Sequence, residues 1–279
     1  MLKPKYWLIG ACLVTANFLF SSIEDYFPYK VEPSASNYGN TGIIEMPNAR
    51  MMPEAQLRFN FSSSYPYEFT SLTASPFNWL EATYRYTEIK TELYGPSLYS
   101  GNQTLKDKGF DLKALVNKET YFLPAISIGL RDVAGTGLFS SEYIVSSKKL
   151  GNLDLSVGIG WGILGTDSNF SNPLNSFHES FKTRDDSQGQ GGTFSFKNWF
   201  SGNTAIFGGI EYDLPKTGLR LKLEYDTSNP DERNAVDDLK SRFNLGFNYS
   251  FSENLSFSSS YERGSKFRIA FKLKGNFLN

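Results

Sequence analysis

The sequence of 279 residues contains one cysteine, Cys12, and one histidine, His178. One cysteine cannot form an intramolecular disulfide, so a small secreted scaffold held by disulfide bridges is excluded. These two residues form no paired ligand spacing, and we therefore expect neither a bound metal ion nor another cofactor. The formal net charge is only −1, without the clustered basic excess of a nucleic-acid binder, so nucleic acid is not an expected partner.

Long hydrophobic runs are absent after Phe20, where no apolar stretch approaches the about 20 residues that a spanning helix needs. Before that point, two lysines precede a short apolar stretch, and two small serines follow it. This order predicts a secretory signal over residues 1–22, cleaved near Ser21 or Ser22. Ile9–Cys12 also resembles a lipoprotein cleavage box, so a lipid on Cys12 is an alternative, and an uncleaved anchor is a third. In each case the chain leaves the cytosol.

The sequence is rich, however, in a two-residue alternation of apolar and polar side chains. In residues 219–226, leucines and a tyrosine occupy every second position and charged residues occupy the others. Residues 243–251 and 267–274 repeat the pattern. Successive side chains of a β-strand point to opposite faces, so each segment predicts a strand with one large apolar face.

Composition favours a barrel in lipid over a water-soluble sandwich, although both show such alternation. The chain is polar on average, yet 16% of its residues are aromatic, with 24 Phe and 16 Tyr. Membrane barrels combine a polar average composition with many aromatic residues, because their apolar and aromatic side chains lie on the outer face. We therefore predict an all-β fold, an antiparallel transmembrane β-barrel of about 12–14 strands.

Residues 23–54 form an irregular N-terminal segment, interrupted by proline and glycine, that is expected to be a plug or a periplasmic arm. A short strand at 41–46 is the one regular piece expected in it. Residues 55–279 form the expected barrel. Its strands are predicted near 55–65, 68–75, 79–88, 108–116, 123–131, 139–149, 152–162, 192–200, 204–213, 218–227, 241–251, 254–263 and 266–275. Their number is odd, whereas bacterial single-chain barrels have an even number, so either 192–200 is wrong or 41–46 joins the wall.

The connections between these strands are of two kinds. Tight turns with an asparagine are predicted at residues 77–78, 150–152, 201–203 and 252–254, since asparagine tolerates the conformations that short hairpins need. Long connections run through 89–107, 132–138 and 163–191. Short turns on one side and long loops on the other are typical of outer-membrane barrels, with the short turns facing the periplasm.

Several separated motifs resemble the YjbH family of outer-membrane proteins. They are Pro33–Arg50, Gly129–Gly137, Gly158–Gly162, Phe207–Tyr212 with Gly218–Tyr225, and Tyr261–Gly264. The resemblance implies a β-barrel and a non-enzymatic role in exopolysaccharide and group 4 capsule production, and it brings no catalytic residues. It extends to the N-terminal barrel part only, because family members are considerably longer and include a second barrel. The chain is therefore expected to be either a natural short form or a truncated reading frame.

The best candidates for function are charged residues that alternation directs into the lumen. Charges of both signs can bind the hydroxyl and carboxylate groups of a sugar polymer, or they can simply pair with one another and fill the lumen. The lumen-lining candidates are Arg58, Glu81, Arg85, Arg220, Lys222, Glu224, Asp226, Arg242, Arg268 and Lys272. The expected partners are outer-membrane lipid, surface polysaccharide and other polysaccharide-export proteins.

Two other functions remain open at this point. His178 lies near Ser176, Ser180 and Asp185, and a histidine with a serine is the pair that a lipid-modifying barrel enzyme, an acyltransferase or phospholipase, would use. A solvated histidine in a polar loop is the simpler interpretation. The second alternative is a secreted, soluble β-sandwich acting as a binding module. The glycine-rich stretch at 188–192 does not lie between a strand and a helix, so it predicts a flexible loop and no phosphate site.

Overall fold

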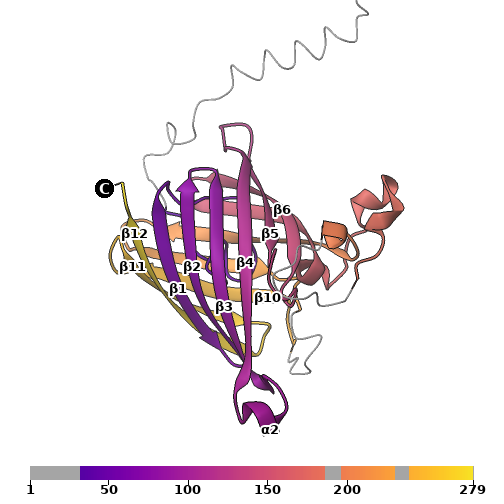
Figure 1. Ribbon diagram of the computed structural model, residues 1–279. Coiled ribbons are helices and arrows are strands. Elements are labelled where there is room, and N and C mark those ends of the chain that lie inside the picture. The colour runs from indigo at the N-terminus through magenta and orange to yellow at the C-terminus, as the bar shows by residue number, and fades with distance from the viewer. Residues whose placement is uncertain (1–31, 186–195, 230–238, 279) are drawn as a thin grey trace, which may run out of the picture.

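The computed structural model describes residues 32–185, 196–229 and 239–278 of the chain. Strands β1 to β12 form one closed antiparallel barrel, in which each strand pairs with its neighbours in the sequence and β1 pairs with β12 (Figure 1). The predicted all-β barrel is confirmed. The predicted signal at residues 1–22 and the stretch at 188–192 lie outside the described residues.

The wall is built from strands of 7 to 14 residues. They are β1 (Gln56–Ser64), β2 (Tyr67–Phe77), β3 (Leu80–Leu93), β4 (Thr104–Asn117), β5 (Ala125–Arg131), β6 (Ser141–Leu150), β7 (Leu153–Trp161), β8 (Thr204–Leu214), β9 (Leu219–Tyr225), β10 (Phe243–Ser250), β11 (Leu255–Glu262) and β12 (Lys266–Asn276). One α-helical turn, α2 (Ser97–Ser100), lies between β3 and β4. Short 3-10 helices occur at Gly162–Gly165, Pro173–Ser176, Glu179–Phe181 and Phe196–Asn198. Among the described residues, no helix combines the length and apolar character needed to cross a bilayer.

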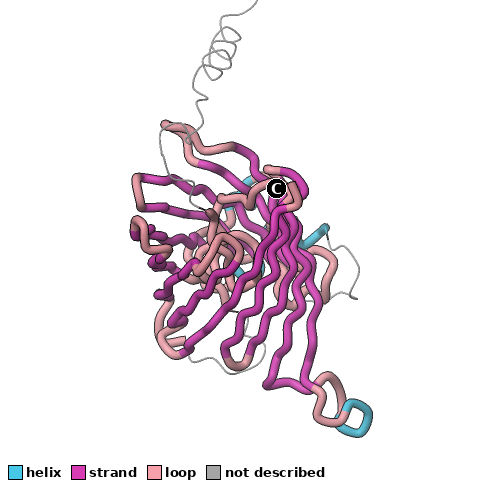
Figure 2. The backbone as a smooth tube through the Cα atoms, turned by 90° about the vertical axis from the view of Figure 1, so that its left-hand side faces the viewer, coloured by secondary structure: helices cyan, strands magenta, loops and turns pink. Residues whose placement is uncertain are grey.

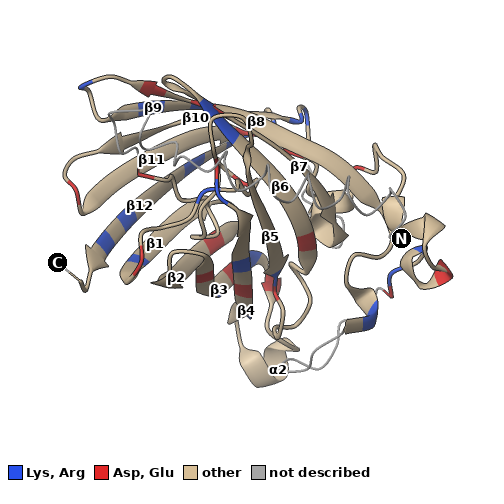
Figure 3. Cartoon of the chain, turned by 90° about the horizontal axis from the view of Figure 1, so that it is seen from above, with Lys and Arg blue, Asp and Glu red and all other residues tan. Residues whose placement is uncertain are grey.

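The alternation in the sequence becomes the inner and outer faces of this wall. On β9, Leu221 is 46% exposed on the outside, whereas its neighbour Lys222 is 5% exposed on the inside. Strand pairing aligns residues of the same face, so that Leu223 lies opposite Leu245 of β10, and Lys222 lies opposite Gly246. Seen from above, charged residues occur on strands all around the barrel (Figure 3).

The two ends of the barrel differ in the length of their connections. The turns β2–β3, β6–β7, β8–β9 and β10–β11 are short and lie at the end where β1 begins and β12 ends. The long connections 94–103, 132–140 and 162–203 lie at the other end, and the one with α2 projects far beyond the wall, opposite the C-terminus (Figure 1). The predicted division into short turns and long loops is therefore present in part, because the connections β1–β2 and β11–β12, at the end with the long loops, are also short.

One predicted strand and one predicted turn are wrong. The described part of the segment at 192–200 begins at residue 196, and Phe196–Asn198 forms a 3-10 helix in the long β7–β8 connection. Asn203 consequently ends this connection and does not occupy a tight hairpin. The piece at 41–46 does not join the wall either, because it makes only isolated bridges within its own segment, Ala35 with Thr41 and Gly42 with Pro47. Removing 192–200 leaves the even number of strands that a closed antiparallel barrel requires.

Residues 32–54, here called the lumen segment, fold into the barrel interior. Figure 2 shows loop segments, in pink, between the strands of the wall. Residues 34–49 are all buried. Two apolar clusters anchor the segment to the inner wall. Met46 and Ala49 pack with Tyr143, Val145 and Phe207, and Tyr38 packs with a second cluster, namely Tyr67, Phe69, Ile89, Leu138 and Phe139.

Candidate functional site

The lumen segment is a compact double turn that places many backbone groups against the wall. The amide of Asn37 donates to the carbonyl of Ile44 at 2.8 Å, and the amide of Ile43 donates to that of Met46 at 2.8 Å. Gly39 has a φ of +99°, and a side chain there would lie only 1.9 Å from the hydroxyl of Ser71. Glycine is therefore required where the turn approaches β2. Other backbone donors and acceptors of the segment contact side chains of the inner wall.

Glu224 of β9 binds the segment from one side. Its carboxylate accepts hydrogen bonds from three consecutive backbone amides, those of Ile44 at 2.8 Å, Glu45 at 2.9 Å and Met46 at 3.0 Å. The side-chain amide of Asn244 also donates to it at 2.9 Å. Glu224 is completely buried. A buried carboxylate is stabilised when several N–H groups donate to it, so the segment and the wall satisfy each other here.

Glu81 of β3 likewise accepts hydrogen bonds from the lumen segment, on the opposite side of the turn. Its carboxylate accepts from the amide and hydroxyl of Thr41, at 3.1 and 2.6 Å, and from the amide of Met52 at 2.7 Å. The ammonium group of Lys113 lies 3.5 Å from Glu81 and also donates to the carbonyl of Arg50. An acid and a base of the wall thus bind the same stretch of backbone.

Basic side chains of the wall bind carbonyl groups of the segment. The guanidinium of Arg58 donates to the carbonyl of Gly39 at 2.8 Å, and that of Arg131 donates to the carbonyl of Glu45 at 2.8 Å. Lys272 donates to the carbonyl of Ala35 at 3.1 Å, and Lys222 donates to that of Ile43. Acids therefore bind N–H groups and bases bind C=O groups, which satisfies the polar backbone in the interior.

Arg50 fixes the end of the segment near the short turns. Its guanidinium donates to Asp154 of β7 at 2.9 and 2.7 Å, and it also forms an ion pair with Glu119. Planar, two-point contacts of this kind are among the stronger ion pairs in proteins. Glu119 accepts in addition from the amide of Lys149 at 2.8 Å. The wall thus binds the lumen segment at Thr41, at residues 44–46 and at Arg50.

Arginines and aromatic rings form a layer toward the long loops. The guanidinium carbon of Arg131 lies 4.4 Å from the ring centre of Tyr38, and that of Arg85 lies 5.0 Å from it. Arg85 forms an ion pair with Asp111 at 3.4 Å. Arg268 lies 5.2 Å from the ring of Phe69 and pairs with Glu262 at 3.0 Å. Cation–π contacts and ion pairs together stabilise these buried charges.

Loop residues 132–140 extend this layer. Phe139 is 2% exposed and lies edge-on to Phe69, with ring centres 5.8 Å apart. The carboxylate of Asp132 accepts from the amide of Phe139 at 3.1 Å. Burial raises the pKa of Asp132 to about 6, although nearby Arg85 acts to lower that pKa. The interior is therefore filled from both ends, by the lumen segment and by this loop.

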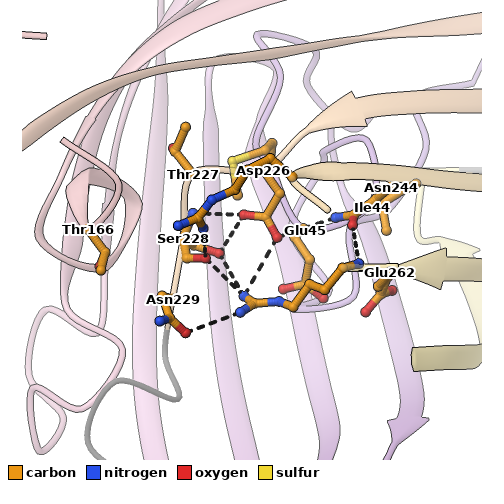
Figure 4. A network of polar contacts seen from close by, with 12 residues as sticks. Ile44, Glu45, Thr166, Asp226, Thr227, Ser228, Asn229, Asn244 and Glu262 are labelled. Atoms are coloured by element: carbon orange, nitrogen blue, oxygen red, sulfur yellow. Dashed lines mark hydrogen bonds and ion pairs between the residues drawn. The ribbon is translucent and has the colours of Figure 1, made fainter. Parts of the chain in front are cut away.

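Residues 226–229 form a second polar network at the same level. The carboxylate of Asp226 accepts from the amide and the hydroxyl of Ser228, at 2.8 and 2.7 Å. Asn244 donates to Asp226 at 3.3 Å as well as to Glu224, and so connects this network to the lumen segment. Figure 4 shows these groups converging around Asp226 and Glu45.

Eight of the ten lumen-lining candidates lie on strands of the wall, and Asp226 directly follows β9. The side chains of these nine residues are buried. Arg220 donates to Asp213 and, at 2.9 Å, to the hydroxyl of Ser34 in the lumen segment. The exception is Arg242, which precedes β10, is half-buried, and pairs at 3.0 Å with Asp167 of the β7–β8 connection. Most of the candidates therefore contact the chain's own N-terminal segment.

Further residues of the same interior were not among the candidates. They are Asp111, Lys113, Arg131, Asp154, Glu211 and Glu262. All six occupy the inward positions of predicted strands, so the same alternation could have found them. The lumen segment itself carried no such signal, because its backbone rather than its side chains makes most of the contacts.

His178 is an exposed residue of the β7–β8 connection. Its ring nitrogen Nδ1 accepts from the amide of Ser180 at 3.1 Å and lies 2.9 Å from the hydroxyl of the same serine. These contacts cap the 3-10 helix Glu179–Phe181. Within the described residues, no three acidic, histidine or cysteine side chains gather in a way that could hold a metal ion.

Comparison with known proteins gives the following relatives. A family model described as exopolysaccharide biosynthesis protein YbjH, of the YjbH family, matches residues 34–279. The uncharacterized lipoprotein YjbH of Escherichia coli (strain K12) is 41% identical over 253 residues, which are 90% of this chain and 36% of that protein. The chain thus spans about a third of the length of this curated relative.

Solved structures with a similar backbone are more distant in sequence. The KdgM porin in complex with disordered oligogalacturonate is 8% identical, with a TM-score of 0.40, over 80% of this chain and 99% of that one. The NanC porin is 10% identical, with a TM-score of 0.37, over 78% and 98% of the two chains. The family match includes both the barrel and the segment inside it, and the resemblance seen in the sequence is confirmed: the chain belongs to the YjbH family.

Proposed function

We propose that this chain is an outer-membrane barrel that assists the export or assembly of surface exopolysaccharide, including capsule, without catalysing a reaction itself. Membership of a family described by exopolysaccharide biosynthesis supports this proposal. The observation that carries it is the polar contact between the wall and the lumen segment, centred on Glu224, Glu81 and the basic residues that bind carbonyl groups.

The chemistry of this contact suits a sugar polymer. The wall binds the lumen segment through carboxylates that accept N–H groups and cations that bind carbonyl oxygens. Sugar hydroxyls can donate and accept in the same way, and sugar carboxylates can bind the cations. Replacing one set of hydrogen bonds by another costs little, whereas leaving a buried polar group without a partner costs about 1–3 kcal/mol. A polymer can therefore take over the hydrogen bonds that the wall makes with the lumen segment. We regard the lumen segment as a gate.

Surface polysaccharide and other export proteins are accordingly the proposed partners. Deletion of the gene is expected to reduce polysaccharide outside the cell and on its surface, because the export route loses one component. Extracellular and attached polysaccharide would be measured in the deletion strain and in the strain complemented with the gene. Unchanged amounts in both fractions would refute the proposed role.

The outer face supports insertion into a lipid bilayer. Large exposed hydrophobic side chains, such as Leu221, Leu245 and Phe271, follow the outward positions of the strands. A contiguous apolar surface of this kind is not normally left in water. Outer-membrane lipid is therefore a proposed partner. For maturation we propose cleavage near Ser21 or Ser22. The name of the lipoprotein relative favours the alternative, a lipid on Cys12, and the intact mass of the mature chain distinguishes the two.

The bilayer predicts a large effect of charge on the outer face. The Leu221→Lys substitution is expected to lower the free energy of unfolding from lipid vesicles by about 2–4 kcal/mol, because a lysine must enter the apolar layer. Unfolding by denaturant in vesicles gives this value. Leu98→Lys is the matched control, since Leu98 is 85% exposed on α2 beyond the wall and should tolerate lysine. Equal effects of the two substitutions would show that the wall does not face lipid.

A further inference from the structure

A small cavity lies where the lumen segment enters the barrel, at the end that carries the short turns. Its volume is about 60 Å³. The lining comes from β1, β12, the β10–β11 hairpin and the start of the lumen segment. Basic side chains contribute Arg58, Lys272 and Lys274, and polar side chains include Asn248 and Ser256.

The two buried cations of this cavity contact neutral oxygen atoms. Lys272 is 5% exposed, and its ammonium group lies 3.1 Å from the carbonyl of Ala35 and 3.4 Å from the side-chain oxygen of Asn248. Arg58 is 3% exposed and donates to the carbonyl of Gly39. Neither lies within 4.0 Å of a carboxylate of the described residues; Glu81 attracts Arg58 and Glu211 attracts Lys272 only at longer range.

Other buried lysines of the interior differ in this respect. Lys113 has Glu81 at 3.5 Å, and Lys222 has Glu211 at 3.6 Å. The acidic residues that line the cavity do not compensate Lys272 in the same way. Glu32 pairs with Lys274 and accepts from Gln56, and Glu253 lies on the exposed β10–β11 turn. The cavity thus has an excess of buried positive charge.

A buried cation without a counter-ion is unfavourable, and an anion in contact with it relieves the cost. The cavity volume of about 60 Å³ is several times the about 10–15 Å³ that one water molecule needs, which leaves room for a small oxyanion. Serine hydroxyls and the amide of Asn248 can donate further hydrogen bonds to an oxyanion. Charge-assisted bonds from lysine and arginine are the strong contacts of phosphate and carboxylate sites.

We propose that this cavity binds one small oxyanion, a phosphate or carboxylate group, through Lys272 and Arg58. The site is separate from the contact between Glu224 and the lumen segment, and its test does not depend on whether a polymer passes through the barrel. It would bind a free anion or a charged group of a larger molecule. Binding there stabilises the entry of the lumen segment, because the same lysine also contacts Ala35.

The test is a set of thermal-unfolding titrations of the purified chain in detergent micelles. Inorganic phosphate and glucuronate are added separately, at constant ionic strength maintained with chloride. A saturable rise of Tm with either anion is expected for the wild type, since a ligand that binds only the folded state stabilises it by mass action. A response to phosphate alone or to glucuronate alone identifies the source of the oxyanion. The absence of a saturable response to both would overturn the proposal.

Variants locate the response. Lys272→Gln keeps a donor for the carbonyl of Ala35 but removes the charge, so the rise of Tm should be lost. Lys272→Arg should retain it. Lys216→Gln is the matched control, because Lys216 is an exposed lysine on the β8–β9 turn at the same end of the barrel and should respond as the wild type does. An unchanged response of Lys272→Gln would overturn the proposal.

A second variant tests the same site if Lys272→Gln does not fold. Asn248→Asp places a carboxylate where an oxygen now lies 3.4 Å from the ammonium group of Lys272. This internal counter-ion should abolish the anion response and raise Tm in buffer without phosphate. A variant that still responds as the wild type does would contradict an oxyanion site at Lys272.

Discussion

The Glu224→Ala substitution is expected to loosen the lumen segment and to open a conducting path through the barrel. Alanine leaves the amides of Ile44, Glu45 and Met46 without the acceptor that binds all three. Each buried donor without a partner costs about 1–3 kcal/mol, so the contact is weakened by several kcal/mol. Single-channel recording in planar bilayers measures the result: rare or no openings for the wild type, and frequent openings for the variant.

One control variant and one further measurement make this result specific. Glu68→Ala removes a carboxylate whose pair with Lys90 is partly exposed and outside the lumen segment's contacts, so conductance should not change. Protease sensitivity of residues 32–54 should rise in Glu224→Ala together with conductance. A variant that stays closed, with the segment still protected, would mean that Glu224 is not what holds the gate.

Deletion of residues 34–50 is expected to produce the largest conductance. These residues are buried or half-buried inside the barrel. Their removal exposes the inward-facing charged side chains of β1, β3, β9 and β12 to water. The barrel should still form, because the strand ladder is closed without the segment. Its Tm should fall, since the contacts of Glu81, Glu224 and Arg50 with the segment are lost. Single-channel recording measures the conductance. Heat-modifiable migration on gels, followed as a function of temperature, shows that the barrel forms and gives its Tm.

A second deletion serves as the control. Replacing residues 95–102 by a short glycine-serine linker shortens the β3–β4 connection around α2, which projects beyond the barrel (Figure 1). This variant should keep the wild-type conductance and Tm. If removal of residues 34–50 gives no more current than this control, the lumen segment is not the gate, and loop residues 132–140 with Phe139 become the next barrier to test.

These experiments separate the gate from the proposed export role. If Glu224→Ala opens the barrel and the gene deletion does not alter polysaccharide, the lumen segment is a gate for another solute. If the gene deletion lowers polysaccharide and both gate variants stay closed, the barrel acts in assembly without passage of polymer through its lumen. The anion site at Lys272 is tested independently, since its readout is Tm in the presence of phosphate or glucuronate.

The wall could be predicted because its signal is local. Whether Lys222 points inward and Leu221 outward depends only on the pleat of one strand, and the alternation in residues 219–226 records it directly. The failure at 192–200 has the same origin. A short run of aromatic and polar residues resembles a strand, but Phe196–Asn198 pairs with none of the strands that the structure describes and forms a turn of 3-10 helix.

Local pattern therefore established the direction of the side chains, the apolar outer surface, the short and long connections and the inward charges. Only the closed barrel established what those charges bind. Ile44 and Glu224 are 180 residues apart, and Ala35 and Lys272 are 237 apart. The lumen segment has no alternation, because it is held through backbone N–H and C=O groups, which every residue possesses and which leave no mark in the composition. Its place in the interior follows from the shape of the surrounding wall, which exists only after β1 has paired with β12.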